Sequence, residues 1–179
     1  FNSFFILLQR KNFKDIKVTD IIREAQCSRA TFYTHYSHKN DLLEDIIQQL
    51  FKEMITAYRS TYVQKTMIDI QKLTDEPLNL LHHFKHFGEH YQLLLSDKLQ
   101  IDFRARLQKV LVQLYIEDFE LQATQTECKV NDSLLERYCG YGLAGLIVDW
   151  IEDDFPIEPD AFSEELVKVF RYLLVTARV

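Results

Sequence analysis

The chain has 179 residues and a formal net charge of −6, with 47% hydrophobic and 27% charged residues, which suits one globular domain or a small domain attached to a larger one. Only 4 Gly and 3 Pro are present, and so few turn-forming residues predict an all-α fold and argue against sheets and long loops. No stretch approaches the roughly 18 apolar residues of a membrane span and no signal peptide is visible, so we expect a cytoplasmic protein with no membrane partner.

The cysteines give no sign of a disulfide framework or a zinc site. Cys27, Cys128 and Cys139 are odd in number and lack CxxC spacing, so we expect reduced thiols. The sequence predicts neither a metal centre nor a cofactor.

The N-terminal region predicts three short helices around an aromatic core, the minimal setting for a helix-turn-helix. The first helix is predicted to end near residues 10–12, and its apolar side consists of Phe1, Phe4, Phe5 and Leu8. The next segment is expected to cover the motif from beneath with Phe13, Ile16 and Val18.

Residues 16–39 predict the two helices of the motif and the start of the next. Thr19 stands just before an apolar face and is predicted as the N-cap of the second helix. Ser28 is predicted to cap the third helix, in which Phe32 and Tyr36 are four residues apart and share the inward face.

The other faces of the third helix are suited to DNA. They offer a guanidinium, two hydroxyls, a phenol and an imidazole, and no carboxylate, from Arg29, Thr31, Thr34, Tyr33 and His35. Lys39 is expected to open the following helix, where a cation is unfavourable unless an anion such as a DNA phosphate lies beside it. Residues 10–39 hold seven basic and three acidic side chains, which predicts a DNA-facing lobe on an otherwise acidic body.

The segment IKVTDIIREAQCSRATFYTHYSHKNDLLEDI resembles the DNA-binding domain of the TetR/AcrR family of bacterial transcriptional regulators. The resemblance covers roughly residues 4–47 and includes the pattern T-x-Y-x-x-[FY]-x-x-K, formed by Thr31, Tyr33, Tyr36 and Lys39. The sequence departs from the family at Gln26, where Gly is usual and a left-handed backbone is expected, at a cost on the order of 1 kcal/mol.

This resemblance implies a regulator and not an enzyme. Its DNA-binding residues are predicted as Thr19, Ser28, Arg29, Ala30, Thr31, Tyr33, Thr34, His35 and Lys39. The boundaries are predicted as 1–47 for the DNA-binding domain and 48–179 for a larger helical bundle that dimerises and binds a ligand.

The body is predicted to be a series of amphipathic helices. The first, from residue 40 to about 62, keeps a wide apolar stripe and is long enough to belong to both lobes. A Thr74–Pro77 signal starts the next helix, with Gly88 as its C-terminal cap, and Ser133 starts a capping-box pattern. Further helices are predicted at about 77–88, 91–95, 99–124, 133–154 and 160–177.

The last two of these helices have more apolar surface than one bundle needs, which predicts a symmetric homodimer. The predicted interface residues are Gly142, Gly145, Leu146, Phe162, Leu166, Phe170 and Leu173. The segment GLIVDWIEDDFPIEPDAFSEEL also resembles, more weakly, the C-terminal segment of one branch of the same family.

The resemblance also implies a small-molecule effector in the second lobe, whose binding releases the protein from a palindromic operator, as in a repressor. The predicted pocket is aromatic and aliphatic, which favours a largely apolar effector. Its lining is predicted as Phe84, Phe87, Tyr91, Phe103, Leu107, Leu111, Tyr115, Tyr138 and Tyr141.

Two alternatives stay open. The same fold could recruit a protein partner and bind no effector, for which the acidic run at residues 152–154 offers a contact. A histidine-based metal protein or metalloenzyme is the alternative of a different class, because His82, His86 and His90 repeat every fourth residue. No nucleophile, paired catalytic carboxylates or phosphate-binding loop accompanies them.

Overall fold

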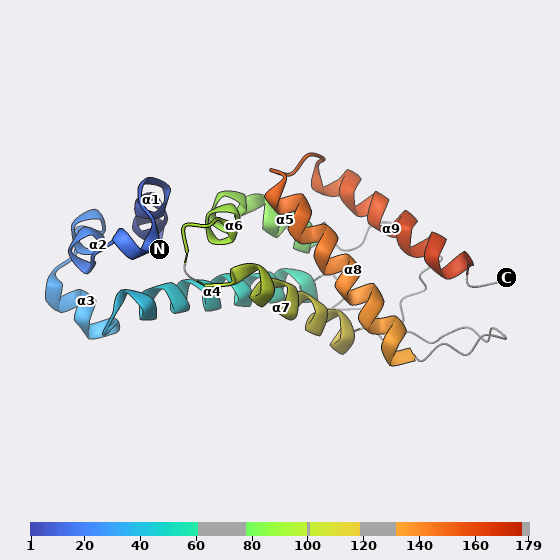
Figure 1. Cartoon of the computed structure of the whole chain (residues 1–179), viewed down its shortest axis with the longest axis horizontal. Helices are drawn as coiled ribbons and strands as arrows, with labels where there is room; N and C mark the ends of the chain where they lie inside the picture. Colours follow the sequence, from blue (N-terminus) through green and yellow to red (C-terminus); the bar gives the residue numbers. More distant parts are fainter. Residues whose placement is uncertain (61–77, 100, 119–131, 177–179) are drawn as a thin grey trace.

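The computed structural model describes residues 1–60, 78–99, 101–118 and 132–176, and all its regular elements are helical, as predicted (Figure 1). The side chains of Phe170 and Leu173 and the predicted Thr74–Pro77 signal lie outside the description. The elements are α1 (Asn2–Arg10), the 3₁₀ turn η1 (Phe13–Asp15), α2 (Val18–Glu24), α3 (Arg29–His35), α4 (Lys39–Ser60), α5 (Leu78–His86), α6 (Gly88–Leu95), α7 (Phe103–Asp118), α8 (Asp132–Glu152) and α9 (Pro159–Thr176).

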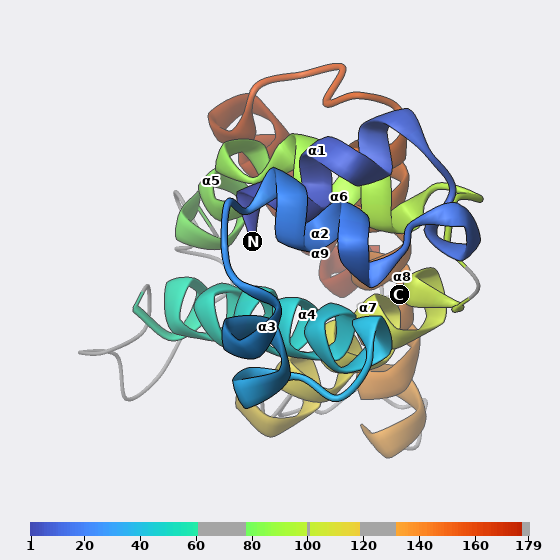
Figure 2. The ribbon, with the colours of Figure 1, turned by 90° about the vertical axis from the view of Figure 1, so that its left-hand side faces the viewer.

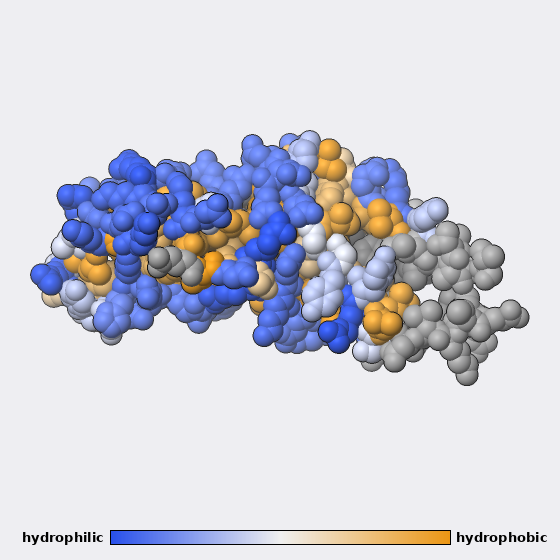
Figure 3. Space-filling view, in the orientation of Figure 1, coloured by the Kyte–Doolittle hydropathy of each residue, from blue (hydrophilic) through white to orange (hydrophobic). Residues whose placement is uncertain are grey.

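The head, as we name α1, η1, α2 and α3, gathers at one end of the elongated molecule (Figure 1), and Figure 2 shows these helices from that end. Hydrophilic side chains cover most of its visible surface in Figure 3. Its interior is apolar and consists of Phe4, Phe5, Leu7, Leu8, Phe13, Ile16, Ile21 and Phe32. The expected three-helix setting with an aromatic core is therefore present.

α4 is shared by the head and the body, the name we use for α5 to α9. It runs 22 residues from beside α3 to the body (Figure 1), and it buries apolar residues along its whole length. These are Leu42, Leu43, Ile46, Ile47, Leu50, Met54 and Tyr58. Since the buried residues of head, α4 and body form one connected cluster, the two lobes share a continuous apolar core.

The body packs α8 back along α7, while α9 lies against α5 (Figure 1). Its centre is aromatic. The rings of Phe84 and Tyr91 meet edge to face at 4.8 Å, and the rings of Phe51 on α4 and Phe103 on α7 stack at 5.7 Å. Such pairs favour a definite packing geometry in addition to the burial of apolar area.

Several predicted helix ends need correction. α7 begins at Phe103, and the predicted extension to residue 124 runs into residues outside the description. α8 already includes Ser133, which is therefore not its N-cap. The last helix, predicted from about residue 160, begins one residue earlier at Pro159.

Gly88 is the first residue of α6 and not the C-terminal cap of α5, and its φ is not positive. A Cβ atom added there would lie 2.6 Å from Cε2 of Phe155, so the ring of Phe155 takes the place of a side chain at this position. Phe155 is itself held in a left-handed conformation with φ of 55° and packs edge to face on Trp150 at 4.8 Å. The glycine is required by a contact distant in sequence.

Candidate nucleic-acid interface

The start of α3 is fixed by a local cap, as the sequence predicts. Ser28 has an extended backbone, and its Oγ accepts a hydrogen bond from the Thr31 N–H at 2.9 Å. The Thr34 hydroxyl donates to the Ala30 carbonyl at 2.9 Å. Because the first turn carries no acidic residue, its positive helix end stays available to an anion.

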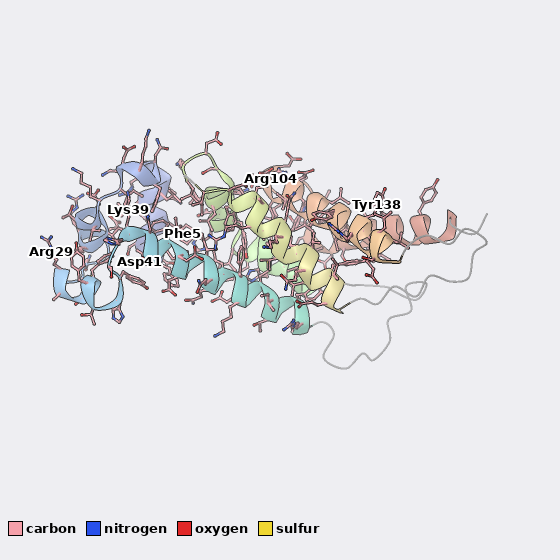
Figure 4. All side chains as sticks on the ribbon, turned by 60° about the horizontal axis from the view of Figure 1, so that its bottom comes forward. Phe5, Arg29, Lys39, Asp41, Arg104 and Tyr138 are labelled. Atoms are coloured by element: carbon pink, nitrogen blue, oxygen red, sulfur yellow. The ribbon has the colours of Figure 1, made fainter. Side chains whose placement is uncertain are left out.

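The outward face of α3 brings together the polar groups predicted to contact DNA. Arg29, Thr31, Thr34 and His35 are exposed, and Tyr33 is 46% exposed. The guanidinium carbon of Arg29 lies 5.7 Å from the centre of the Tyr33 ring. Figure 4 shows Arg29 at the outer end of the head, so nothing in the described chain covers this side chain.

The inward face of α3 is anchored on α4. Phe32 is buried, and the hydroxyl of half-buried Tyr36 donates to the Asp45 carboxylate at 2.7 Å. Burial, followed by this hydrogen bond, raises the pKa of Tyr36 to about 12, so its phenol remains a donor at neutral pH. The hydrogen bond to Asp45 holds the C-terminal end of α3 against α4.

The turn between α2 and α3 is strained at one residue. Gln26 has a φ of 51°, which confirms the left-handed backbone expected at this position. Its N–H donates to the Arg23 carbonyl at 3.2 Å, and the next N–H, of Cys27, donates to the Ile22 carbonyl at 3.1 Å. A side chain in this conformation destabilises the turn relative to glycine.

Thr19 does not cap α2. The helix begins at Val18 with Lys17 as N-cap, and the Asp20 carboxylate accepts the Lys17 backbone N–H at 3.1 Å. This hydrogen bond, followed by that from the Lys11 ammonium, holds the pKa of Asp20 below its usual range. Thr19 is left as an exposed residue in the first turn of α2. The prediction erred because Asp20 can cap from inside the helix.

Lys39 opens α4 as predicted, but its ammonium has partners that the sequence did not indicate. It donates to the backbone carbonyls of Phe13 at 2.7 Å, Ile16 at 2.8 Å and Lys14 at 3.1 Å. An ammonium has three N–H donors, so these acceptors occupy all of them. The carboxylate at the start of α4 is Asp41, which accepts the His38 N–H at 2.8 Å (Figure 4). The predicted phosphate contact of Lys39 stays a prediction.

Beside α3, η1 and the α3–α4 turn border a shallow, open hollow of about 500 Å³. It is lined by Lys14, Ile16, Lys17, Val18, Tyr33, Ser37, His38, Lys39 and Asn40. Lys14, Lys17 and His38 were not among the predicted contact residues, although the basic excess of residues 10–39 already pointed to this region. Exposed Lys14 and Lys17 beside the Tyr33 phenol are suited to an anion, and DNA presents regularly spaced phosphates.

The residues of the predicted effector pocket differ in how far they are buried, and their pocket stays a prediction. Phe84, Tyr91, Phe103, Leu107, Leu111 and Tyr115 are buried in the body, and Phe87 is half-buried. Tyr138 and Tyr141 differ from this expectation, since they are 66% and 55% exposed on α8 (Tyr138 is labelled in Figure 4). Their positions on the outer face of α8 explain the difference.

One buried polar pair lies within this aromatic centre and was not predicted. A ring nitrogen of His83 and the Tyr91 hydroxyl lie 2.9 Å apart in a hydrogen bond. Burial lowers the pKa of His83 to about 4, so the imidazole is neutral at physiological pH.

The predicted dimer residues fall into two groups. Gly142, Gly145 and Leu146 lie on the open side of α8, where a Cβ added to either glycine would meet nothing within 4 Å. Phe162 and Leu166 are buried within the same chain, out of reach of a second copy. The inward face of α9 packs on the body and is therefore used within the protomer.

The regularly spaced histidines do not converge. His82 lies 3.5 Å from Asp160, and His90 stacks on Phe5 of α1 with ring centres 3.9 Å apart. Among the described residues, no three His, Cys, Asp or Glu side chains are grouped so that they could hold a metal ion. No helix within the described ranges is long and apolar enough to span a bilayer.

Two family models match different parts of the chain. Residues 5–46 match "Bacterial regulatory proteins, tetR family", and residues 71–172 match "Transcriptional regulator C-terminal region". An uncharacterized HTH-type transcriptional regulator, YxbF of Bacillus subtilis (strain 168), is 38% identical over 50 residues. Those residues are 28% of this chain and only 13% of that protein.

Solved structures share the fold over almost the whole chain. The dihydroxyacetone kinase operon activator DhaS superimposes with a TM-score of 0.62 at 23% identity, covering 99% of this chain and 92% of that one. A TetR transcriptional regulator from Streptococcus agalactiae 2603V superimposes with a TM-score of 0.56 at 22% identity. The match covers 99% of this chain and 90% of that one. At these identities the likeness establishes the fold alone.

Proposed function

Because the chain belongs to the tetR family of bacterial regulatory proteins, we propose that it binds a palindromic operator as a homodimer and reads the sequence with α3. It is a DNA-binding transcriptional regulator and not an enzyme. We expect it to act in the cytoplasm, as a repressor, with residues 1–47 as the DNA-binding domain and 48–179 as the remainder.

The main support for this proposal is the outer face of α3, which has no acidic side chain and lies beside the basic hollow. Arg29, Thr31 and Thr34 are proposed to contact base edges, because a guanidinium and hydroxyls suit the donors and acceptors of the major groove. Thr19, Ser28, Tyr33 and His35 are proposed to hold phosphates, and Ala30 lies close enough to the helix start to pack against DNA. We add Lys14, Lys17 and His38 to the phosphate contacts because they line the hollow with Tyr33.

The proposed dimer rests on a stripe along α8. Tyr138, Gly142 and Leu146 follow one another at intervals of four residues, with Tyr141 and Gly145 at the intervening positions, so all five share one side of the helix. The tyrosines and Leu146 are exposed, and the glycines leave room for a facing backbone. A second α8 packed on this stripe would bury apolar area and place two copies of α3 in successive major grooves.

DNA selected from a random pool supplies the ligand for the test, with fluorescence anisotropy as the readout. Arg29→Ala should relax the preference at one base pair by about 1 to 3 kcal/mol. Lys14→Ala should instead weaken binding to all sequences alike, and the slope of log affinity against log salt concentration should fall by about 1. Lys109→Ala, which removes an exposed charge from α7, is the matched control and should change neither. Uniform loss with Arg29→Ala would show that the residue contacts only phosphate.

The dimer is tested by light scattering at micromolar concentration. Leu146→Glu places a charge in the α8 stripe and should yield monomers, whereas Ile116→Glu, at an equally exposed position on α7, should not. A wild-type monomer bound to a single non-repeated half-site would rule out the proposed assembly.

For the body we propose an effector site that takes a largely apolar small molecule. The aromatic and aliphatic side chains around Phe84 and Phe103 support this chemistry. The second candidate, recruitment of a protein partner without an effector, is favoured by one observation: Phe84, Tyr91 and Leu107 are fully buried against their neighbours. An apolar or aromatic compound that raises the Tm and weakens operator binding would favour the effector, and a compound panel without any such hit would favour recruitment.

A further inference from the structure

One residue of the body, Lys98, contacts both the last turn of α1 and the start of η1. Lys98 lies in the turn between α6 and α7. Its ammonium donates to the carbonyls of Leu8 at 3.0 Å and Gln9 at 2.7 Å, and its own carbonyl accepts the Phe13 N–H at 2.9 Å. These contacts span about 90 residues of sequence and join the body to the head.

The side-chain contacts fill a need of α1. The last carbonyls of a helix have no partner within it and must find a donor. α1 ends at Arg10, and the C-cap residue Lys11 is extended. Its N–H donates to the Leu7 carbonyl, which leaves the carbonyls of Leu8 and Gln9 to other donors. Lys98 supplies that donor, and its positive charge suits the negative end of the helix dipole.

The same segment is held from its other side by the helix that follows the recognition helix. The Phe13 carbonyl accepts from Lys39, whose ammonium also contacts the carbonyls of Lys14 and Ile16. Phe13 therefore joins Lys98 through its N–H and Lys39 through its carbonyl. A continuous series of hydrogen bonds runs from the body, through η1, to the first residue of α4, four residues after the end of α3.

We propose that Lys98 is a positioning residue for DNA recognition, which sets the angle at which the body carries α3. The inference rests on the proposed dimeric mode of binding, because the orientation of each head decides whether two copies of α3 reach successive grooves together. A head freed from Lys98 still carries an intact α3, since the Ser28 cap and the bond from Tyr36 to Asp45 lie wholly within the head and α4.

The test compares a palindromic operator with a single half-site, using the full chain. Lys98→Met keeps the apolar stem and removes the donors. It should weaken binding to the palindrome about tenfold, near the lower end of the 5- to 150-fold range of coupling between sites, with little change at the half-site. Binding should also depend less sharply on the spacing between half-sites. Lys98→Arg, which retains donors for both carbonyls, should restore most of the affinity, and Lys109→Met controls for the lost charge.

Equal losses on palindrome and half-site, or no loss on the palindrome, would overturn the inference. Amide hydrogen exchange without DNA gives an independent readout. Lys98→Met keeps the main-chain carbonyl that accepts the Phe13 N–H, but without the side-chain bonds to α1 this contact should open more often, so the Phe13 N–H should exchange faster than in wild type while the Tyr36 N–H should not change. An unchanged Phe13 amide would also overturn it. If the wild type does not prefer the palindrome, the proposed dimeric mode is wrong. The exchange rate of the Phe13 amide then tests by itself whether Lys98 holds the head in place.

Discussion

His83 predicts how the stability of the body depends on pH. Its side chain is 8% exposed, it bonds to Tyr91, and burial lowers its pKa from 6.5 to about 4. Two charged neighbours act in opposite directions, since Glu53 favours the imidazolium and His86 disfavours it. The folded state therefore binds this proton less readily than the unfolded chain does.

The sign and the size follow from linkage. A pKa lowered by folding means that the unfolded state takes up more protons between pH 6.5 and about 4, so stability falls as the pH falls through that window. From these two values, His83 should cost about 2 kcal/mol of stability at pH 5 relative to pH 7.5.

Urea unfolding at pH 7.5 and pH 5 measures this effect in wild type and in His83→Gln, whose amide can still bond to Tyr91 but does not titrate. The wild type should lose about 2 kcal/mol more than the variant over this interval. An NMR titration of the His83 ring should show a midpoint well below 6.5. Equal losses in the two proteins would refute the reasoning, because the buried imidazole would then not be the group that takes up the proton.

Three substitutions test other features. Gln26→Gly should raise stability by about 0.5 to 1 kcal/mol, because it relieves the left-handed strain, and a lower Tm would contradict this. Gly88→Ala should destabilise by about 1 to 3 kcal/mol through the close contact with Phe155, and a second change, Phe155→Leu, should recover part of that loss in urea unfolding. Arg106→Gln removes the two bonds to Glu44 on a partly exposed pair, so the free energy of unfolding should fall by less than about 1 kcal/mol, and the pKa of Glu44 should rise toward its usual range. A larger loss of stability would show that this pair does more than join two surfaces.

The features that could be predicted from the sequence are those fixed by near neighbours. The Ser28 cap needs only Thr31 three residues later, and the left-handed Gln26 lies in a turn whose length is set locally. The all-α fold follows from the low content of Gly and Pro. The start of α9 is predicted to within one residue, because Pro159 is a helix-start residue.

The features that could not be predicted depend on residues far apart in sequence. The role of Gly88 could not be predicted, because no residue near it in sequence indicates that the ring of Phe155 occupies the space beside it. The carbonyls that surround the Lys39 ammonium could not be predicted, because they lie 23 to 26 residues earlier, while its phosphate contact stays a prediction. The apolar pattern of α8 is equally consistent with an inner and an outer face, and so it could not separate Tyr138 from the buried aromatic residues.

The bond between Arg106 and Glu44 divides α4 into arms of unequal length. Arg106 on α7 donates to both carboxylate oxygens of Glu44, at 2.9 Å and 2.6 Å. At 1.5 Å per residue, the arm toward Lys39 is about 8 Å long and the arm toward Ser60 about 24 Å. If α4 turned about this contact as a rigid rod, its head end would move about one third as far as its body end. A change at the body end of α4 that keeps this contact would then reach α3 reduced, whereas a change that releases Arg106 would lose this constraint.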